Sequence, residues 1–532
     1  MSFLRYILIV VVLAATLPLA SCKGIVERSP GRLVQTLPSD PPTLNPIVAS
    51  DSTSGEVTGY IYESLLDRDN STLELKPRLA DSWEVSADHL SYTMRLRQGV
   101  RWHDGKPFTA DDVVYTFERM MDPKVDAANL RNYFKDVKGV EKLDDFTVRV
   151  IYREPYFKAL EIISGATIIP KHIFDDGADF NSHPAGRRPI GTGPYRFEEW
   201  KSGRSIRLTR NEDYWGQKPD ISGIDYKVVP DSTVRFQLLK KQATDLETLR
   251  PIQWARQTEG KKFEADFAKY RYWLPNYSYI GWNMQSPLFS DKRVRRAMTM
   301  LVNREQLLKE ILLGQGEIVT SGFYKFGPQY DKSIEPLPYD PAAAKELLAE
   351  AGWSDHDGDG VIDKDGMPFK FTLLAGAGSV FARSVGLIMR EDMSRAGIEM
   401  EIRQLEWATM LKLLADRSFE ATLLAWSLPI TQDPYQVWHS SQSDKGSNAV
   451  GFANKRADEI LEAARREFDD SKRNAMYTEL QRIIFEEQPY TFLFINPSLV
   501  AVSKRFGDVK EYRLGLDPRE WSLKPWTRLI QW

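Results

Sequence analysis

The sequence predicts a mixed α/β fold with more than one structural unit, and three observations support this prediction. The chain has 532 residues, more than one hydrophobic core usually organises. Segments in which polar and apolar residues alternate, as in half-buried strands, lie among segments with the apolar spacing of helices. No internal repeat, low-complexity tract or block of like charge interrupts them. We therefore expect continuous structure along the chain.

The N-terminal segment predicts export from the cytoplasm. Arg5 gives it a positive start, residues 6–19 form an apolar run too short to span a bilayer with ease, and small residues precede Cys22. The pattern resembles a bacterial lipoprotein signal peptide at 1–21, which implies lipidation of Cys22 and a membrane-anchored, extracytoplasmic protein. The alternative is an uncleaved anchor with an incidental cysteine. Cys22 is the only cysteine, so the rest folds without disulfides.

The predicted elements follow in chain order. Strands are expected at 91–97 and 146–152, where polar and apolar residues alternate. Helices are expected around residue 297, from Pro341 to Gly352, and around residue 461. The apolar positions that define these faces are Tyr92, Met94 and Leu96 on the first strand, Val294, Ala297, Met298 and Leu301 on the first helix, and Ile460, Leu461 and Ala464 on the last.

Two turns look like active-site motifs but are expected to be structural. His103 and Gly105 follow a strand and precede Lys106-Pro107, which is typical of a turn. Gly191 and Gly193 lead into a predicted strand at 195–200 and open no helix, so a phosphate loop is not expected and the glycines are expected to allow a tight backbone turn. The six histidines have no metal-ligand spacing, and GxSxG and P-loop motifs are absent. We expect no catalytic residues and no enzymatic activity.

The composition argues against some partners and favours a ligand-binding cleft. Lys and Arg number 71 against 74 Asp and Glu, so no net positive field would attract nucleic acid or an anionic membrane. The 14 Trp, 22 Tyr and 25 Phe residues exceed what a core needs. Trp and Tyr combine an apolar body with a polar tip, which suits a cleft that binds and releases a ligand.

An ordered set of short motifs runs along the chain. In order they are PTLNP at 42–46, IYESLL at 61–66, PRLADSW at 77–83, LRQGVRWHDGKP at 96–107, TADDV at 109–113, PIGTGPY at 189–195, NEDYWG at 211–216 and DKRVRRA at 291–297. Their order and spacing resemble the large solute-binding proteins of peptide and nickel ABC importers. The resemblance runs from about Val34 to the C-terminus.

This resemblance implies a two-lobed periplasmic-binding-protein-like fold of type II, in the large peptide-binder subclass. Lobe I would hold 32–57, 188–276 and 491–532, an additional domain 58–187, and lobe II 277–490. Two chain crossings would form a hinge on which the lobes close over ligand.

The implied function is capture of a solute, most simply an oligopeptide, for delivery to an ABC permease, by a monomer without a cofactor. The alternatives are import of a non-peptide solute, or a ligand-sensing or surface interaction lipoprotein on the same scaffold.

The resemblance also implies a set of cleft residues. They are Ser50, Asp51, Tyr133, Tyr277, Trp407, Trp426 and Tyr490. Each of the aromatic residues could instead be core packing.

The chain departs from the family pattern close to Trp426. Peptide binders of the family carry an aspartate three residues after this tryptophan, where it pairs with the ligand's α-amino group, but here the position is Pro429. A buried ammonium needs a counter-charge, so Asp433, or else Asp51, is predicted to supply it. Alternatively, the ligand has no free amine, and Trp438 and His439 meet a different head group.

One acidic loop has the spacing of a calcium site. Asp355, Asp357, Asp359 and Asp363 take positions one, three, five and nine of an EF-hand-like loop, but Gly366 stands where the closing glutamate belongs. The preferred interpretation is an Asx-rich hairpin between a helix ending at Trp353 and a strand at 369–374. A weak structural calcium site is the alternative.

Overall fold

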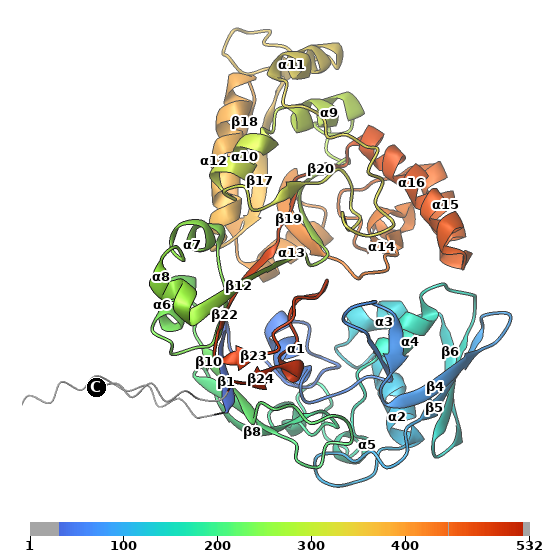
Figure 1. Ribbon diagram of the computed structural model, residues 1–532. Coiled ribbons are helices and arrows are strands. Elements are labelled where there is room, and N and C mark those ends of the chain that lie inside the picture. Colours follow the sequence, from blue (N-terminus) through green and yellow to red (C-terminus); the bar gives the residue numbers. More distant parts are fainter. Residues whose placement is uncertain (1–30, 445, 525–532) are drawn as a thin grey trace, which may run out of the picture.

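The structure, a computed structural model, describes residues 31–444 and 446–524. Two lobes lie one above the other and are joined along one side (Figure 1). The lower lobe contains both ends of the described chain and the upper lobe its middle, as expected for the two-lobed α/β fold. Within the described ranges, no helix is long and apolar enough to cross a membrane. The predicted signal peptide and Cys22 lie outside these ranges.

The alternating segments of the first half form a four-stranded antiparallel sheet in the predicted additional domain. Its order is β4 (Ala80–Val85), β5 (Ser91–Leu96), β7 (Thr147–Tyr152) and β6 (Val137–Asp144). Tyr92, Met94 and Leu96 are buried, which confirms the predicted face of β5. Helix α2 (Ala110–Met121) packs on β6 and β7. The other elements here are β2 (Leu66–Arg68), β3 (Leu75–Pro77), α3 (Ala128–Phe134), α4 (Ala159–Gly165), α5 (Lys171–Phe174) and the 3-10 turn η1 (Pro184–Gly186).

Lobe I is built on two further sheets. The first has the order β1 (Arg32–Leu37), β10 (Gly223–Val228), β9 (Ser205–Arg210) and β8 (Tyr195–Lys201), and the second β11 (Leu246–Thr248), β22 (Ser498–Ser503) and β12 (Phe267–Tyr272). The remaining elements are α1 (Ser52–Thr58), α6 (Ser232–Lys240), α7 (Pro251–Arg256), α8 (Lys261–Asp266), β23 (Phe506–Gly507), η3 (Pro518–Glu520) and β24 (Ser522–Leu523). One hydrophobic cluster extends from Leu37 through the additional domain to Tyr226. The two regions therefore share a core.

The two glycine-containing turns are hydrogen-bonded to each other. The backbone N–H of His103 donates to the Gly191 carbonyl at 2.8 Å, and the Gly191 N–H donates to His103 Nδ1 at 3.2 Å. A Cβ on Gly191 would lie 1.9 Å from the carbonyl oxygen of Ile61, so glycine is required for this close approach. Burial lowers the pKa of His103 to about 4. Both motifs have a structural role here, as predicted.

Lobe II is organised around a five-stranded mixed sheet. Its order is β18 (Glu399–Leu405), β17 (Lys370–Gly376), β19 (Ala421–Ser427), β13 (Asn276–Trp282) and β20 (Tyr490–Phe492). The predicted helices are present as α9 (Lys292–Met300), α11 (Pro341–Glu350) and α15 (Lys455–Arg466). The apolar faces predicted for α9 and α15 are buried. The other elements are α10 (Arg304–Glu310), β14 (Glu317–Ile318), β15 (Asp363–Lys364), β16 (Met367–Pro368), α12 (Val380–Arg395), α13 (Trp407–Ala415), α14 (Tyr435–Trp438), η2 (Ser440–Gln442), α16 (Asp470–Glu487) and β21 (Phe494–Ile495).

The chain passes between the lobes at two adjacent points, after β12 and before β22. At the hinge the two crossings hold each other: Asn276 Nδ2 donates to the Asn496 carbonyl at 3.1 Å, and the Asn496 N–H donates to Asn276 Oδ1 at 3.2 Å. β20 and β21 pair with strands of lobe II, so the return crossing follows Ile495, whereas the sequence had suggested a boundary after Tyr490. Long-range strand pairing, which leaves no local signal, accounts for the difference.

Candidate functional site

A small pocket lies where the additional domain meets lobe II. Its cavity volume is about 110 Å³, and its walls come from both sides of the cleft. The additional domain contributes Tyr133, Lys135, Tyr156 and Lys158, and the lobe II contribution includes Tyr277, Trp426, Asp433, Trp438 and Arg465. We call this the interlobe pocket.

The lobe II sheet positions the aromatic wall of the interlobe pocket. Tyr277 on β13 and Trp426 on β19 are direct partners in the strand register, so their side chains lie next to each other on one face. Trp438, on the short helix α14, is fully buried, and its ring lies 4.6 Å from that of Tyr490. The wall is thus a continuation of the lobe II core.

Asp433 is the acidic group of the pocket, and both of its oxygens are engaged. Tyr156 Oη donates to Asp433 Oδ2 at 2.8 Å, Arg465 Nε lies 3.0 Å from the same oxygen, and the Tyr435 N–H donates to Oδ1 at 3.2 Å. Burial and the Asp433 charge raise the pKa of Tyr156 well above its ordinary value. Burial opposes ionisation of Arg465, yet the charge of Asp433 holds its pKa above the usual range.

Lys158 reaches across the cleft from the additional domain. Its side chain is only 4% exposed, and Nζ donates to the carbonyl of Thr431 in lobe II at 2.6 Å. Glu161 lies 3.7 Å from the same nitrogen. Burial lowers the pKa of Lys158, because the desolvated ammonium is only partly compensated by these partners.

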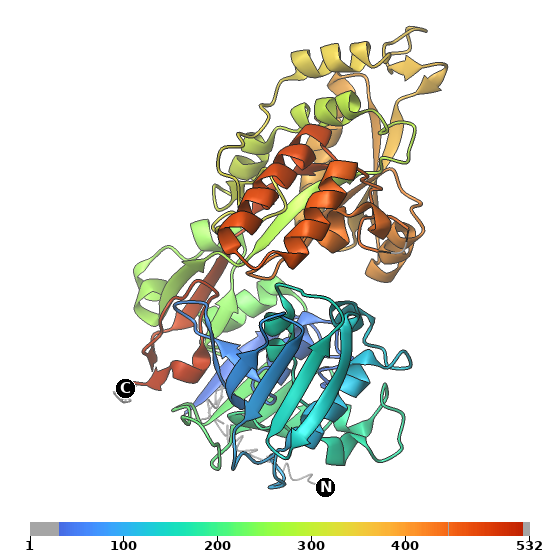
Figure 2. The same ribbon diagram turned by 90° about the vertical axis from the view of Figure 1, so that its right-hand side faces the viewer.

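Further contacts join the same two surfaces. The Phe157 N–H donates to the Arg465 carbonyl at 3.0 Å, and Arg466 pairs with Glu154 at 3.0 Å. Figure 2 shows the lobe II helices α15 and α16 standing directly above the sheet of the additional domain. We define the interlobe latch as Tyr156, Phe157 and Lys158 with Thr431, Asp433 and Arg465. Helix α15, which carries Arg465, lies at the opposite side of the molecule from β12 and β22, the strands next to the hinge (Figure 1).

The structure gathers half of the predicted cleft residues in the interlobe pocket. Tyr133, Tyr277, Trp426, Asp433 and Trp438 line it, and Pro429 does so too. Ligand contact by these residues stays a prediction.

The other five predicted residues lie elsewhere. Ser50 precedes α1, and the Asp51 carboxylate caps that helix by accepting from the Ser54 N–H at 2.8 Å. Trp407 begins α13 and is 55% exposed. The His439 ring is buried and stacks on Tyr435, and the Tyr490 ring stacks on Tyr279. For Asp51, His439 and Tyr490, the structure therefore gives a local role in capping or packing.

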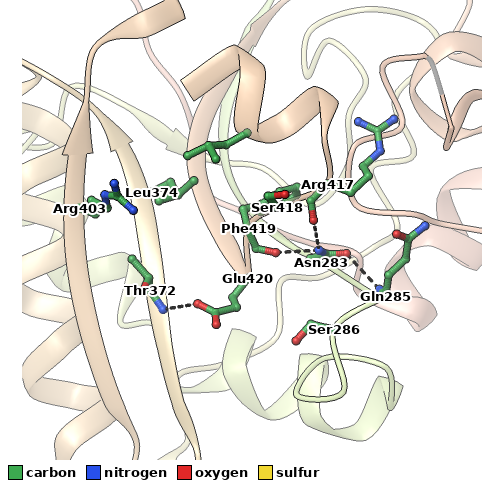
Figure 3. A pocket seen from close by; sticks show the side chains of 11 residues that line it. Asn283, Gln285, Ser286, Thr372, Leu374, Arg403, Arg417, Ser418, Phe419 and Glu420 are labelled. Atoms are coloured by element: carbon green, nitrogen blue, oxygen red, sulfur yellow. Dashed lines mark hydrogen bonds between the residues drawn. The ribbon is translucent and has the colours of Figure 1, made fainter. Parts of the chain in front are cut away.

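A larger cavity of about 510 Å³ lies within lobe II (Figure 3). Its polar groups mostly hold the ends of strands together: Glu420 accepts from the Thr372 N–H at 2.7 Å, and Asn283 Nδ2 donates to the Phe419 carbonyl at 2.7 Å. All lining residues, including Arg403 and Arg417, belong to lobe II. Closure of the two lobes cannot enclose a solute there, so we do not assign the solute site to this cavity.

The acidic loop is closed by an antiparallel bridge between Ser354 and Asp363, and the hairpin expected between α11 and β17 turns at Asp365 and Gly366, after the acidic positions. β15 pairs with β16 between α11 and β17, and the Asp355 carboxylate accepts from the backbone N–H groups of Gly358 and Gly360 at 2.7 and 3.1 Å. Oxygens of Asp355, Asp357 and Asp359 come within 4.8 Å of one another, whereas Asp363 accepts from His356. These Asx turns account for the local acidic spacing, and calcium binding stays a prediction.

Sequence reasoning missed Tyr156, Lys158 and Arg465. A Tyr-Phe-Lys run after a predicted strand is an ordinary loop sequence, and no spacing links it to a helix some 300 residues later. Only the fold brings these residues together.

Known proteins share this architecture and sequence. A family model described as "Bacterial extracellular solute-binding proteins, family 5 Middle" matches residues 74–448. The oligopeptide-binding protein AppA of Bacillus subtilis is 32% identical to this chain, over 90% of this chain and 89% of AppA. Di/tripeptide-binding protein 2 of Pseudomonas aeruginosa is 28% identical, over 92% of this chain and 93% of that protein.

Solved structures agree with the sequence matches. The structure of Bacillus subtilis AppA in complex with a nonapeptide superimposes with a TM-score of 0.83 at 30% identity, covering 93% of this chain and 99% of AppA. The binding protein DppA of Helicobacter pylori, in complex with the peptide STSA, gives a TM-score of 0.79 at 25% identity, covering 93% and 98%. The match extends over both lobes and the additional domain. The chain therefore belongs to family 5 of the bacterial extracellular solute-binding proteins.

Proposed function

We propose that this protein is the solute-binding component of an ABC importer and that it captures a peptide outside the cytoplasm. The observation that carries the proposal is the interlobe pocket, whose walls come from both sides of the cleft, so that closing encloses the solute and opening releases it. The peptide class is supported by relatives named as oligopeptide- and di/tripeptide-binding proteins. The proposal assigns no catalytic step and no cofactor, and the protein acts as a monomer that hands its solute to a membrane permease.

The size of the pocket bears on which part of a peptide it holds. At about 110 Å³ it is smaller than the roughly 300–1,000 Å³ of most small-molecule sites. A second cavity of about 260 Å³ shares Tyr156, Tyr435 and Arg465 with it. In our proposal the interlobe pocket takes one side chain or one end of the peptide, and a longer peptide holds the lobes further apart.

Binding of peptides to ligand-free protein tests the function. The protein would be unfolded to remove endogenous ligand, refolded, and mixed with pools of synthetic peptides of graded length. A ligand at one thousand times its Kd stabilises the native state by about 4.1 kcal/mol, so bound pools should raise the melting temperature. Mass spectrometry of the retained fraction then identifies the peptides. A refolded protein that retains none of them, in any length class, contradicts the proposal.

We propose further that Cys22, outside the described residues, carries the lipid that anchors the protein. Replacing Cys22 by Ser should move the protein from the membrane to the soluble fraction or block its processing, because multiple acyl chains, each contributing about 0.8 kcal/mol per buried methylene, would be lost. Fractionation and intact mass measure both effects. Unmodified full-length protein that is soluble without detergent in its own host would be inconsistent with an anchor.

A further inference from the structure

A separate cavity of about 340 Å³ lies on lobe I, between α1 and residues 512–519, which we call the C-terminal segment. Both segments lie on the side of lobe I that faces lobe II (Figure 1). Glu56 and Tyr60 line it from α1 and the residues after it, and Tyr512, Asp517 and Arg519 line it from the C-terminal segment. None of the cleft residues predicted from the sequence is among its lining residues.

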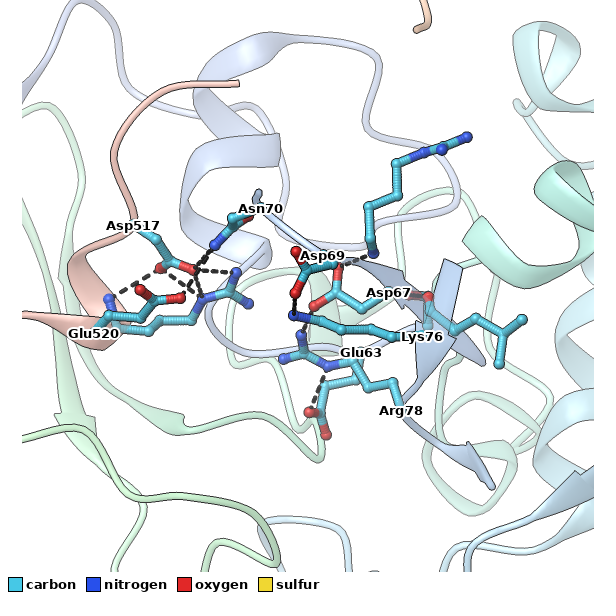
Figure 4. A network of polar contacts seen from close by, with 12 residues as sticks. Glu63, Asp67, Asp69, Asn70, Lys76, Arg78, Asp517 and Glu520 are labelled. Atoms are coloured by element: carbon cyan, nitrogen blue, oxygen red, sulfur yellow. Dashed lines mark hydrogen bonds and ion pairs between the residues drawn. The ribbon is translucent and has the colours of Figure 1, made fainter. Parts of the chain in front are cut away.

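The C-terminal wall of this cavity is held in place by its own network (Figure 4). Arg519 forms a two-point ion pair with Asp517, with Nε and Nη2 at 2.8 and 2.7 Å from the two carboxylate oxygens. Asn70 donates to Asp517 at 3.1 Å and to Glu520 at 3.2 Å, and Tyr512 Oη donates to Glu520 at 2.5 Å. Because the charges of Asp517 and Arg519 cancel, the net charge of the cavity lining is that of Glu56.

Within the described part of the chain, the Glu56 carboxylate has no hydrogen bond and no ion pair. Its side chain is exposed to the cavity, yet the surrounding protein excludes enough water to raise the pKa of Glu56 to about 7, and the charge of Glu247 adds to the rise. The Glu56 carboxylate is thus an acidic group on the cavity wall without a partner among the described residues. A charged group that stabilises nothing in the fold is a candidate for binding.

The two acids that the sequence suggested for an amine are already engaged. Asp433 holds Arg465 and Tyr156, and Asp51 accepts from the N–H and the hydroxyl of Ser54 at 2.8 and 2.5 Å. Glu56 lies five residues after Asp51, about one and a half helical turns, and is unpaired among the described residues. It is therefore the better placed of the three to receive a positive charge from outside the protein.

We propose that Glu56, with the rings of Tyr60 and Tyr512, forms a subsite for a positively charged group of the ligand, an ammonium or a guanidinium. The carboxylate supplies the counter-charge, and the tyrosine rings offer faces that attract cations. This inference rests on the proposed function, because it names the chemical class of peptide that the cleft prefers. It assigns the cation to lobe I, away from the position three residues after Trp426.

A competition between two peptide pools tests the subsite. One pool contains random pentapeptides with free amines, Lys and Arg, and the other is N-acetylated with norleucine in place of Lys and Arg. Ligand-free protein is offered both, and the retained peptides are quantified by mass spectrometry. Wild type should prefer the charged pool by about tenfold or more, as expected for a hydrogen-bonded charge pair. Glu56→Gln should remove most of this preference, whereas Glu346→Gln, an exposed glutamate on α11, should keep it.

The outcomes separate this inference from the proposed function. If both pools bind wild type and Glu56→Gln keeps the preference, the subsite is wrong and peptide capture stands. If wild type binds both pools equally, no cation is selected and the subsite is again wrong. If neither pool binds, the proposed function fails and the subsite fails with it.

A stability measurement separates a binding role for Glu56 from a structural one. A carboxyl whose pKa is raised in the folded state destabilises the fold when ionised, so its contribution becomes unfavourable as the pH rises from about 4.5 through 7. We therefore expect the difference in melting temperature between Glu56→Gln and wild type to be more positive at pH 8 than at pH 5. The charged and titratable groups around it, Glu247, Tyr60, Tyr226, Tyr272, Asp517 and Arg519, are unchanged in the variant. A variant that melts well below wild type at pH 8 would overturn the subsite.

Discussion

Asp433→Asn is expected to weaken peptide binding by about 10- to 100-fold, whether or not the peptide carries a free amine. The reason lies in the interlobe latch. Tyr156 Oη of the additional domain donates to Asp433 of lobe II, so in the proposed function this hydrogen bond forms on closure, and a hydrogen bond to a charged group contributes about 1.5–3 kcal/mol. The Arg465 pair lies within lobe II and persists in the open state, so its loss lowers stability more than affinity.

Calorimetric titration with free and N-acetylated forms of one peptide measures this effect. Tyr156→Phe should reproduce much of the loss of affinity with little loss of stability, because it removes the same interlobe hydrogen bond and leaves the Asp433–Arg465 pair. Asp416→Asn, which removes an exposed pair with Lys412, is the matched control and should bind as wild type. A loss confined to free-amine peptides would instead make Asp433 the amine partner.

Glu63→Gln is expected to destabilise the protein by about 3–5 kcal/mol, the cost of breaking a buried charged pair. The Glu63 side chain is fully buried and accepts from Arg78 Nε at 2.8 Å, Tyr214 Oη at 2.7 Å and Trp215 Nε1 at 2.9 Å. Figure 4 shows Arg78 between Glu63 and Asp67. The neutral amide of Gln cannot balance the charge of Arg78. Its NH₂ group is a donor at a position where the carboxylate oxygen accepted a hydrogen bond, so it faces another donor.

Thermal unfolding of ligand-free protein tests this prediction. Glu63→Gln should lower the melting temperature by several degrees. Glu84→Gln is the control, because its pair with Arg95 is exposed, with side chains 68% and 62% accessible, and exposed pairs contribute under about 1 kcal/mol. Equal melting curves for the two variants would mean that the buried Glu63–Arg78 pair contributes no more stability than an exposed pair.

Much of the fold could be predicted from the sequence, because its signals are local. Alternation over 91–97 gave the buried face of β5, and helical spacing gave the buried face of α9, since each pattern depends only on residues within one element. The limit of lobe II could not be found this way. β20 belongs to that lobe only because Tyr279 pairs with Phe492, and pairing between strands more than 200 residues apart has no periodic signature.

The candidate site was predictable only where family resemblance or aromatic character marked a residue. Trp426 and Trp438 were identified in this way and line the interlobe pocket. Arg465 is one of four basic residues on α15, and Glu56 is the single acid of the short helix α1. Arg465 is distinguished by its contact with Asp433, and Glu56 by the absence of a partner among the described residues. Both properties depend on distant segments of the chain, so no local sequence pattern reveals them.

The position of β22 has a consequence for how the chain reaches its final form. This strand is the middle member of the β11-β22-β12 sheet, yet it follows all of lobe II in the sequence. During synthesis, lobe II can complete its own sheet first, whereas β11 and β12 must wait with unpaired edges until Ser498–Ser503 emerges. Open edges of this kind recruit other strands and promote aggregation. A chain that ends before this strand would therefore expose two such edges and would be prone to aggregate.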